Sequence, residues 1–130
     1  MQDSFAHSVK EWIDKADNDL GFAAASFKDF DEFYSQMCLL CHDAVEKYLK
    51  GYLIGKKRQL IRTHDLMALL KECESIDKEF SSFADNCRKL NLYYTPIKYP
   101  SHFPPLAKED AKISIKTAEK IKKFIKEKIK

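Results

Sequence analysis

The chain has 130 residues and a formal net charge of +3, and 45% of its residues are hydrophobic and 33% are charged. This length predicts a single domain over residues 1–130 with a hydrophobic core, and it is too short for a catalytic domain plus a separate regulatory one. No apolar run approaches the roughly 18 residues that span a bilayer, so a membrane-spanning protein is excluded. Residues 1–7 have neither the basic start nor the apolar segment of an export signal, which predicts a cytoplasmic location.

The chain begins with two predicted amphipathic helices. Apolar residues recur at three- and four-residue steps over residues 5–27, which is the spacing of one helical face. A second stretch with this spacing runs from about Glu32 to Gly55, and glycine is a common residue at helix ends. We expect these two helices to form an antiparallel hairpin.

Three further helices are expected in the second half of the chain. Thr63 is a suitable N-cap for a short third helix over residues 66–73, and apolar residues at positions 76–90 indicate a fourth. Glu109 and Asp110 open a last helix in which isoleucines and alanines recur at helical spacing. Five helices with mostly short connections predict an all-α fold, an up-and-down helical bundle of four to five helices.

The segment from Tyr94 to Pro105 interrupts this pattern, because it contains all four prolines of the chain. Proline lacks an N–H group and disfavours a helical conformation at the residue before it, so the segment is predicted to be a loop between the last two helices. The loop would hold Lys98, Tyr99 and His102 partly exposed, as binding residues often are. A lysine pairs with phosphate, a tyrosine ring stacks on a base, and a histidine transfers protons near neutral pH. In the alternative, structural interpretation, Tyr94 and Tyr99 pack the end of the bundle and Lys98 is solvated.

The segment Cys38-Leu39-Leu40-Cys41-His42 has the spacing by which haem is attached in c-type cytochromes. It lies inside a strong helical period in a chain without an export signal, so both cysteines are predicted to be core residues. Cys73 and Cys87 lack a second ligand pair at the short spacing of zinc sites. Because a glycine-rich phosphate loop is also missing, we predict no metal and no cofactor, and four reduced, mostly buried thiols.

Charged residues suggest two surfaces. Eight lysines lie between residues 112 and 130, where they would attract RNA by counterion release. Acidic residues are interspersed among them, which favours a solvated helix face instead. In the second helix, Asp43 and Glu46 lie one turn apart and are suited to surface ion pairs with Lys47 and Lys50.

Four segments, taken in order, resemble the HEPN domain: Trp12 with Ala16, Asp19-Leu20 and Ala23; Ala44-Val45-Glu46-Lys47-Tyr48-Leu49-Lys50; Thr63-His64-Asp65-Leu66; and Lys98-Tyr99-Pro100. The resemblance covers nearly the whole chain. It implies a compact α-helical domain, usually a homodimer, related to the helical C-terminal domain of kanamycin nucleotidyltransferase and often encoded beside a minimal nucleotidyltransferase. It further implies nucleotide binding, or in other members a ribonuclease or a toxin of a toxin–antitoxin pair.

The ribonuclease members of this family carry an arginine followed four to six residues later by a histidine. Here Lys98 stands where the family commonly has arginine before Tyr-Pro, and His102 follows after three intervening residues. The resemblance implies His102 as general base toward a ribose 2′-hydroxyl and Lys98 as the group that neutralises the phosphate, although lysine lacks the bidentate geometry of arginine. Arg58 and His64 also satisfy the bare spacing, and we interpret that pair as coincidental because it lies in the connection after the second helix.

Together these observations predict a non-catalytic or weakly catalytic HEPN-type helical module. It would bind a nucleotide, RNA or a nucleotidyltransferase partner, in one version as a member of a toxin–antitoxin pair. The predicted nucleotide or RNA-binding residues are Glu46, Lys47, Tyr94, Lys98 and Tyr99. The first alternative is a metal-independent endoribonuclease toxin with His102 and Lys98 as catalytic residues. The second alternative is a homodimer with a purely structural, protein-binding role.

Overall fold

The computed structural model describes the backbone of residues 2–98 and 105–130, and the side chains of residues 6–94 and 105–130. Every regular element in these parts of the chain is helical, which confirms the predicted all-α bundle. The elements are α1 (Gln2–Asp29), α2 (Tyr34–Gly55), α3 (Leu66–Ile76), the 3₁₀ helix η1 (Lys78–Phe83), α4 (Ala84–Lys98) and α5 (Lys108–Lys128). The last of these begins next to the predicted Glu109 and Asp110, and the Asp110 carboxylate accepts a hydrogen bond of 2.8 Å from the Ala107 backbone N–H.

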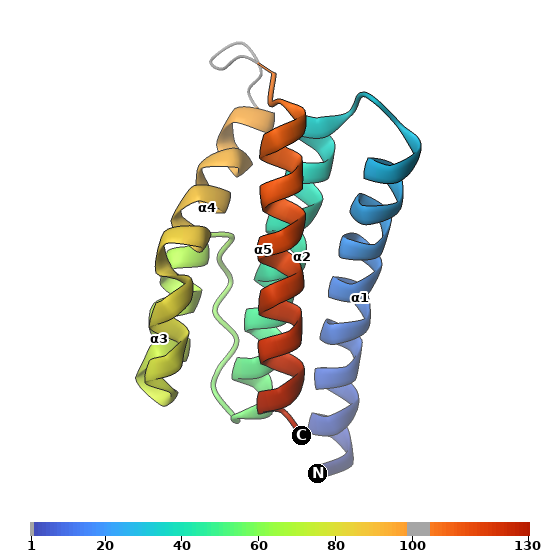
Figure 1. Ribbon diagram of the computed structural model, residues 1–130. Coiled ribbons are helices and arrows are strands. Elements are labelled where there is room, and N and C mark those ends of the chain that lie inside the picture. Colours follow the sequence, from blue (N-terminus) through green and yellow to red (C-terminus); the bar gives the residue numbers. More distant parts are fainter. Residues whose placement is uncertain (1, 99–104) are drawn as a thin grey trace.

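Helices α1 and α2 form the expected antiparallel hairpin (Figure 1). They approach closely at Gly51, where a Cβ atom would lie only 3.1 Å from Ile13 Cδ1 and 3.2 Å from Trp12 Cβ. The connection between them ends at Phe33, whose φ of 69° lies in the left-handed region that residues other than glycine rarely adopt. Phe22, Phe30 and Phe33 leave an exposed aromatic patch at this end of the hairpin.

Helix α2 is the central element of the bundle, since α5, α1, α3 and α4 all pack against it (Figure 1). Between Cys41 and Leu53 nearly every side chain is buried, including those on the face away from α1. The core around it consists mainly of aliphatic and aromatic side chains, among them Leu20, Tyr48, Tyr52, Leu69, Phe80, Leu90, Ile121 and Ile125. A polar group in the middle of α2 is therefore buried unless a neighbouring element leaves it a path to the surface.

The connection between α2 and α3, residues 56–65, runs back along the bundle before α3 begins (Figure 1). The predicted N-cap of α3 is wrong by two residues, because the cap is Asp65 and not Thr63. The Asp65 carboxylate accepts a hydrogen bond of 2.9 Å from Met67 N–H, and Thr63 Oγ1 accepts one of 3.1 Å from Asp65 N–H. Both side chains satisfy backbone donors, but only that of Asp65 satisfies a donor of the helix itself.

The predicted fourth helix is divided in the structure, because residues 78–83 form the 3₁₀ helix η1 and α4 begins only at Ala84. Asp77 is extended, with φ −143°, and its carboxylate accepts a hydrogen bond of 2.9 Å from Glu79 N–H. This local bond ends α3 and starts η1, so Ile76 belongs to α3 and not to the predicted fourth helix.

The predicted start of the Pro-rich loop at Tyr94 is also wrong, because α4 continues through Pro96 to Lys98. Pro96 lacks the N–H that would bond to the carbonyl of Leu92, but this loss falls in the last turn of the helix. Tyr93 and Tyr94, in the preceding turn, contact residues of other elements, which holds that turn helical. Residues 99–104 of the predicted loop lie outside the described part of the chain.

All four cysteines are free and fully buried, as predicted. Cys38 and Cys41 lie within the continuous helix α2 and belong to the core, so the haem-like spacing has a structural explanation. Burial raises the pKa of the Cys38 thiol to about 11 and that of Cys87 to about 12, so both thiols are protonated at neutral pH. Among the described residues, no helix has the length and apolar character needed to cross a membrane.

Asp17 joins three helices through its carboxylate. It accepts hydrogen bonds from the Tyr48 hydroxyl of α2 and from Lys126 Nζ of α5 at 2.9 Å, and Lys122 Nζ lies 3.5 Å away. Partial burial raises the pKa of Asp17, but the bonds from Tyr48 and Lys126 outweigh it, and the net pKa lies below its ordinary value of 3.8. Asp17 therefore stabilises the fold above this ordinary pKa, and its contribution is lost as the pH falls through the lowered one.

We expect Asp17→Asn to lower the free energy of unfolding by about 1 kcal/mol at neutral pH, because asparagine still accepts from Tyr48 but lacks the charge that Lys126 requires. The difference from the unmodified chain should shrink as the pH falls below 3.8. Urea denaturation between pH 7 and pH 3 measures this difference. Asp14→Asn, at a more exposed ion pair on the same helix, is the control. A difference that stays constant with pH would contradict this role of Asp17.

Candidate functional site

Two oppositely charged side chains are buried in the middle of α2. Glu46 and Lys50 are each only 6% exposed, and Lys50 Nζ lies 2.8 Å from Glu46 Oε2. The Lys50 ammonium is also 5.6 Å from the centre of the Trp12 ring, a cation–π contact with α1. Because removing two charges from water costs several kcal/mol per ion, such a pair adds little stability by itself and calls for another explanation.

The second oxygen of Glu46 contacts His64, the penultimate residue of the connection before α3. His64 Nδ1 lies 2.9 Å from Glu46 Oε1, and the His64 side chain is 62% exposed while that of Glu46 is 8% exposed. A carboxylate only accepts hydrogen bonds, so Nδ1 carries the proton in this contact. In the neutral imidazole this leaves Nε2 unprotonated, as an acceptor or base on an otherwise exposed side chain.

Two histidine rings contact Tyr94 of α4. The centre of the Tyr94 ring lies 4.9 Å from that of His42, with the planes tilted by 31°, and 5.1 Å from that of His64. The Tyr94 and His64 planes are inclined by only 19°. Together we call His42, Glu46, Lys50, His64 and Tyr94 the His64 cluster, which joins α2, α4 and the connection before α3.

His42 is fully buried at the base of the His64 cluster. Its Nδ1 lies 3.3 Å from Asp43 Oδ1, and its Nε2 has no hydrogen-bond partner among the described residues. A buried polar atom without a partner costs about 1–3 kcal/mol. Such a cost is unusual enough in folded proteins to require a reason, and a functional site is one.

Asn91 of α4 holds the end of the connection in place. Its side-chain oxygen accepts a hydrogen bond of 2.9 Å from Leu66 N–H, and its amide donates one of 3.0 Å to Asp65 Oδ1. Asn91 and Tyr94 lie one turn apart on α4, so one face of this helix fixes both the backbone beside His64 and its ring.

The structure brings together two of the predicted binding residues, since Glu46 and Tyr94 both contact His64. It does not bring Lys47 to the same place, because Lys47 Nζ forms an ion pair with Asp19 of α1. The backbone of Lys98 is the last residue of α4, but its side chain lies outside the described part, and so do Tyr99 and His102 entirely. The pairs expected for Asp43 and Glu46 are partly present, with Glu46 bound to Lys50 inside the protein and Asp43 beside His42.

His64 was interpreted from the sequence as half of a coincidental Arg–His spacing. In the structure Arg58 pairs with Glu72 of α3 at 2.9 Å, so these two residues do not form a joint site. His64 alone belongs to the cluster. The segment Thr63-His64-Asp65-Leu66 was a signal for it, but only the fold places this segment against Glu46.

His42, Asp43 and Glu46 offer three metal-ligating atoms within 4.8 Å of one another. Their surroundings do not suit a cation, because the Lys50 ammonium occupies Glu46 Oε2 and His64 occupies Oε1. A divalent ion at Glu46 would have to displace a positive charge 2.8 Å away. We therefore interpret these residues as a hydrogen-bonded cluster and not as a metal site.

The fold and the cluster together define a helical bundle domain with a polar site between α2 and α4. The family model of the HEPN domain matches residues 9–129, and the chain belongs to this family. Two solved structures share the fold. TT1696 from Thermus thermophilus has a TM-score of 0.78 and 25% identity over 92% of this chain and 97% of its own. The archaeal HEPN homologue ST0689 has a TM-score of 0.76 and 26% identity over 94% of this chain and 98% of its own. No curated protein is significantly similar to the chain.

Proposed function

We propose that this HEPN domain binds a nucleotide or a short single-stranded RNA at the His64 cluster. The observation that carries the proposal is the geometry of His64, whose side chain is 62% exposed yet is held by a buried carboxylate on one side and a stacked ring on the other. An ordered imidazole at the surface is not required for packing of the core. It favours ligand binding, because a site that is fixed before binding loses less conformational entropy when the ligand binds.

The residue types suit the parts of a nucleotide. The face of His64 turned away from Tyr94 is a platform for a base, and base stacking on side-chain rings tolerates any base. Arg62, exposed two residues earlier in the connection, supplies a charge for phosphate. Lys98, the last residue of α4, and Tyr99 and His102, which follow it in sequence, stay in the proposal as residues that extend the site.

Calorimetric titration of EDTA-treated protein with ATP and with a short single-stranded RNA tests the proposal. We expect saturable binding, weakened about tenfold or more in His64→Ala, since loss of one stacked base costs about 1–3 kcal/mol. His7→Ala is the matched control, because His7 is an exposed histidine that pairs with Glu11 on α1. Equal affinities for His64→Ala and His7→Ala would exclude the His64 cluster as the binding site.

A second function, metal-independent cleavage of RNA, is favoured by the Glu46–His64 pair. A carboxylate that orients an imidazole and leaves Nε2 free is suited to take a proton from a ribose 2′-hydroxyl. Incubation of RNA with the protein in EDTA tests this function, with His64→Ala and His102→Ala compared. If cleavage is lost only in His64→Ala, the general base is His64 of the cluster. If it is lost only in His102→Ala, the general base is His102 of the Pro-rich segment.

The partners expected from the family stay part of the proposal, namely a second copy of the chain and a minimal nucleotidyltransferase, with a toxin–antitoxin pair as one setting. The molar mass in solution, measured with and without RNA, distinguishes a homodimer from a monomer. A dimer that binds neither ATP nor RNA would favour the purely structural alternative.

A further inference from the structure

A pocket separate from the His64 cluster lies between α4 and α5. It has a volume of about 200 Å³, and its apolar wall includes Leu90 and Ile113. Tyr93 lines this pocket, whereas the adjacent Tyr94 belongs to the His64 cluster. Neighbouring helical residues point about 100° apart, so the pocket faces a different side of α4 from the cluster. Its ligand is independent of the function proposed above.

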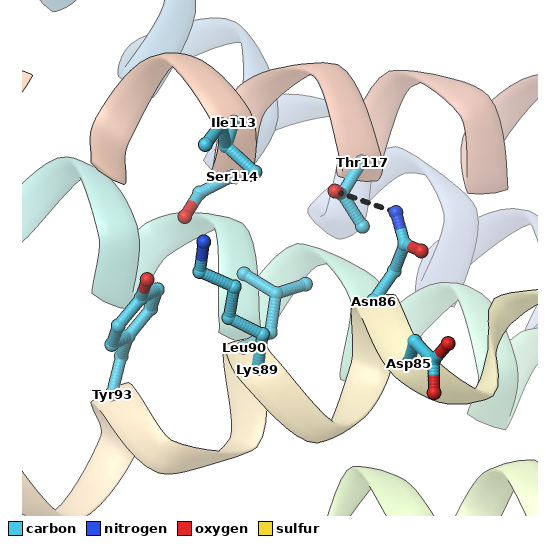
Figure 2. A pocket seen from close by; sticks show the side chains of 8 residues that line it. All are labelled: Asp85, Asn86, Lys89, Leu90, Tyr93, Ile113, Ser114 and Thr117. Atoms are coloured by element: carbon cyan, nitrogen blue, oxygen red, sulfur yellow. Dashed lines mark hydrogen bonds between the residues drawn. The ribbon is translucent and has the colours of Figure 1, made fainter. Parts of the chain in front are cut away.

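Two buried hydroxyl groups line the floor of the pocket. Ser114 is 1% exposed and Thr117 is 4% exposed, both on α5. Thr117 Oγ1 accepts a hydrogen bond of 3.1 Å from the Asn86 amide of α4, which leaves the hydroxyl hydrogen of Thr117 without an acceptor among the described residues (Figure 2). Ser114 donates to Cys38 Sγ at 3.5 Å, and a thiol sulfur is a weak acceptor. Both hydroxyls can therefore donate to a stronger acceptor.

Lys89 lines the same pocket as Ser114 and Thr117. Figure 2 shows the Lys89 amino group pointing toward the Ser114 hydroxyl, with the Tyr93 hydroxyl beside the same space. In the described part of the chain, Lys89 makes no ion pair, while the acidic neighbour Asp85 is paired with Arg88 at 2.9 Å. The other carboxylate nearby, Asp110, accepts a long hydrogen bond of 3.4 Å from Tyr93.

The positive charge continues along the α5 rim of the pocket. Lys116 lies between Ile113 and Thr117 in sequence and is exposed, and Lys112 and Lys120 lie one turn before and after it. None of these three lysines forms an ion pair with a described residue, in contrast to Lys122 and Lys126 on the far side of the helix. The rim therefore attracts negative charge toward the pocket.

We propose that this pocket binds a small organic anion, with its compact apolar body against Leu90 and Ile113 and its head group on Lys89 and the hydroxyls of Ser114 and Thr117. The head group is a carboxylate or a phosphate, since both accept from an ammonium and from hydroxyls. The volume limits the body to about the size of a single small ring.

Amide chemical-shift changes in ¹⁵N-labelled protein test this proposal, with benzoate, phenyl phosphate and the neutral isostere benzamide as probes. We expect saturable shifts around Lys89 and Ser114 with at least one of the two anions, and no saturation with benzamide. The anion that binds tighter identifies the head group. Shifts that are the same for benzamide and for both anions, or that occur only elsewhere in the molecule, would overturn the proposal.

Lys89→Met should weaken binding of the preferred anion about tenfold or more, because a charge-assisted hydrogen bond is lost. Lys123→Met, at an exposed lysine of α5 that does not line this pocket, should leave the affinity unchanged. Thr117→Val keeps the shape of a buried side chain and should weaken binding without unfolding the protein. Equal affinities in Lys89→Met and Lys123→Met would refute the assignment of Lys89. This result would not bear on the proposed binding at the His64 cluster.

Discussion

Glu46→Ala is expected to lower the free energy of unfolding by about 3–5 kcal/mol, which is the cost of leaving one member of a buried ion pair without its partner. Lys50 is only 6% exposed and its ammonium has Glu46 as its carboxylate partner among the described residues. The substitution also removes the carboxylate that orients His64. Urea denaturation measures the first effect, and titration with ATP or RNA under native conditions measures the second.

Two controls separate the buried charge from the loss of packing. The double variant Glu46→Leu with Lys50→Met should recover most of the free energy of unfolding that Glu46→Ala loses. Replacement of a whole buried ion pair by apolar residues often leaves the stability unchanged or raises it. Glu72→Ala, which breaks the more exposed pair with Arg58, should change the free energy of unfolding by about 0.5 kcal/mol or less. A double variant as unstable as Glu46→Ala would show that packing around Glu46 dominates its role.

Phe80→Ala is expected to lower the free energy of unfolding by about 3–5 kcal/mol, because it empties a large volume in the core. Phe80 is fully buried in η1, and its ring centre lies 4.6 Å from that of Tyr52 and 4.9 Å from that of Phe124. This one side chain links η1 to α2 and α5, and the partial collapse of three elements around a cavity is difficult. Urea denaturation followed by circular dichroism measures the effect.

Phe22→Ala is the matched control for Phe80→Ala. The Phe22 side chain is 66% exposed, so its loss should change the stability by about 0.5 kcal/mol or less. If Phe22→Ala were as destabilising as Phe80→Ala, the aromatic patch around Phe22 would have to be covered in solution by another surface.

The long helices were predictable because their periodicity is an average over many residues. Burial of one apolar face stabilises α1, α2 and α5, and no single residue decides their existence. The residues at which the helices begin and end were less predictable, because a single polar contact can decide each of these boundaries. Asp65 and Asp77 each accept a hydrogen bond from a backbone N–H two residues later, and nothing in the apolar pattern marks these positions. The continuation of α4 through Pro96 likewise depends on the contacts of Tyr93 and Tyr94 with other elements.

The sequence by itself determined the all-α class, the buried thiols and the segments typical of the HEPN family, since each follows from composition, spacing or local residue order. Only the tertiary structure separated Glu46 from Lys47. Neighbouring residues of a helix point about 100° apart, so Glu46 meets His64 while Lys47 meets Asp19. The tertiary structure also decided that the connection of residues 56–65 runs back along the bundle. This path places His64 against a carboxylate of α2 and a ring of α4. These contacts join residues far apart in the chain, and no local pattern encodes them.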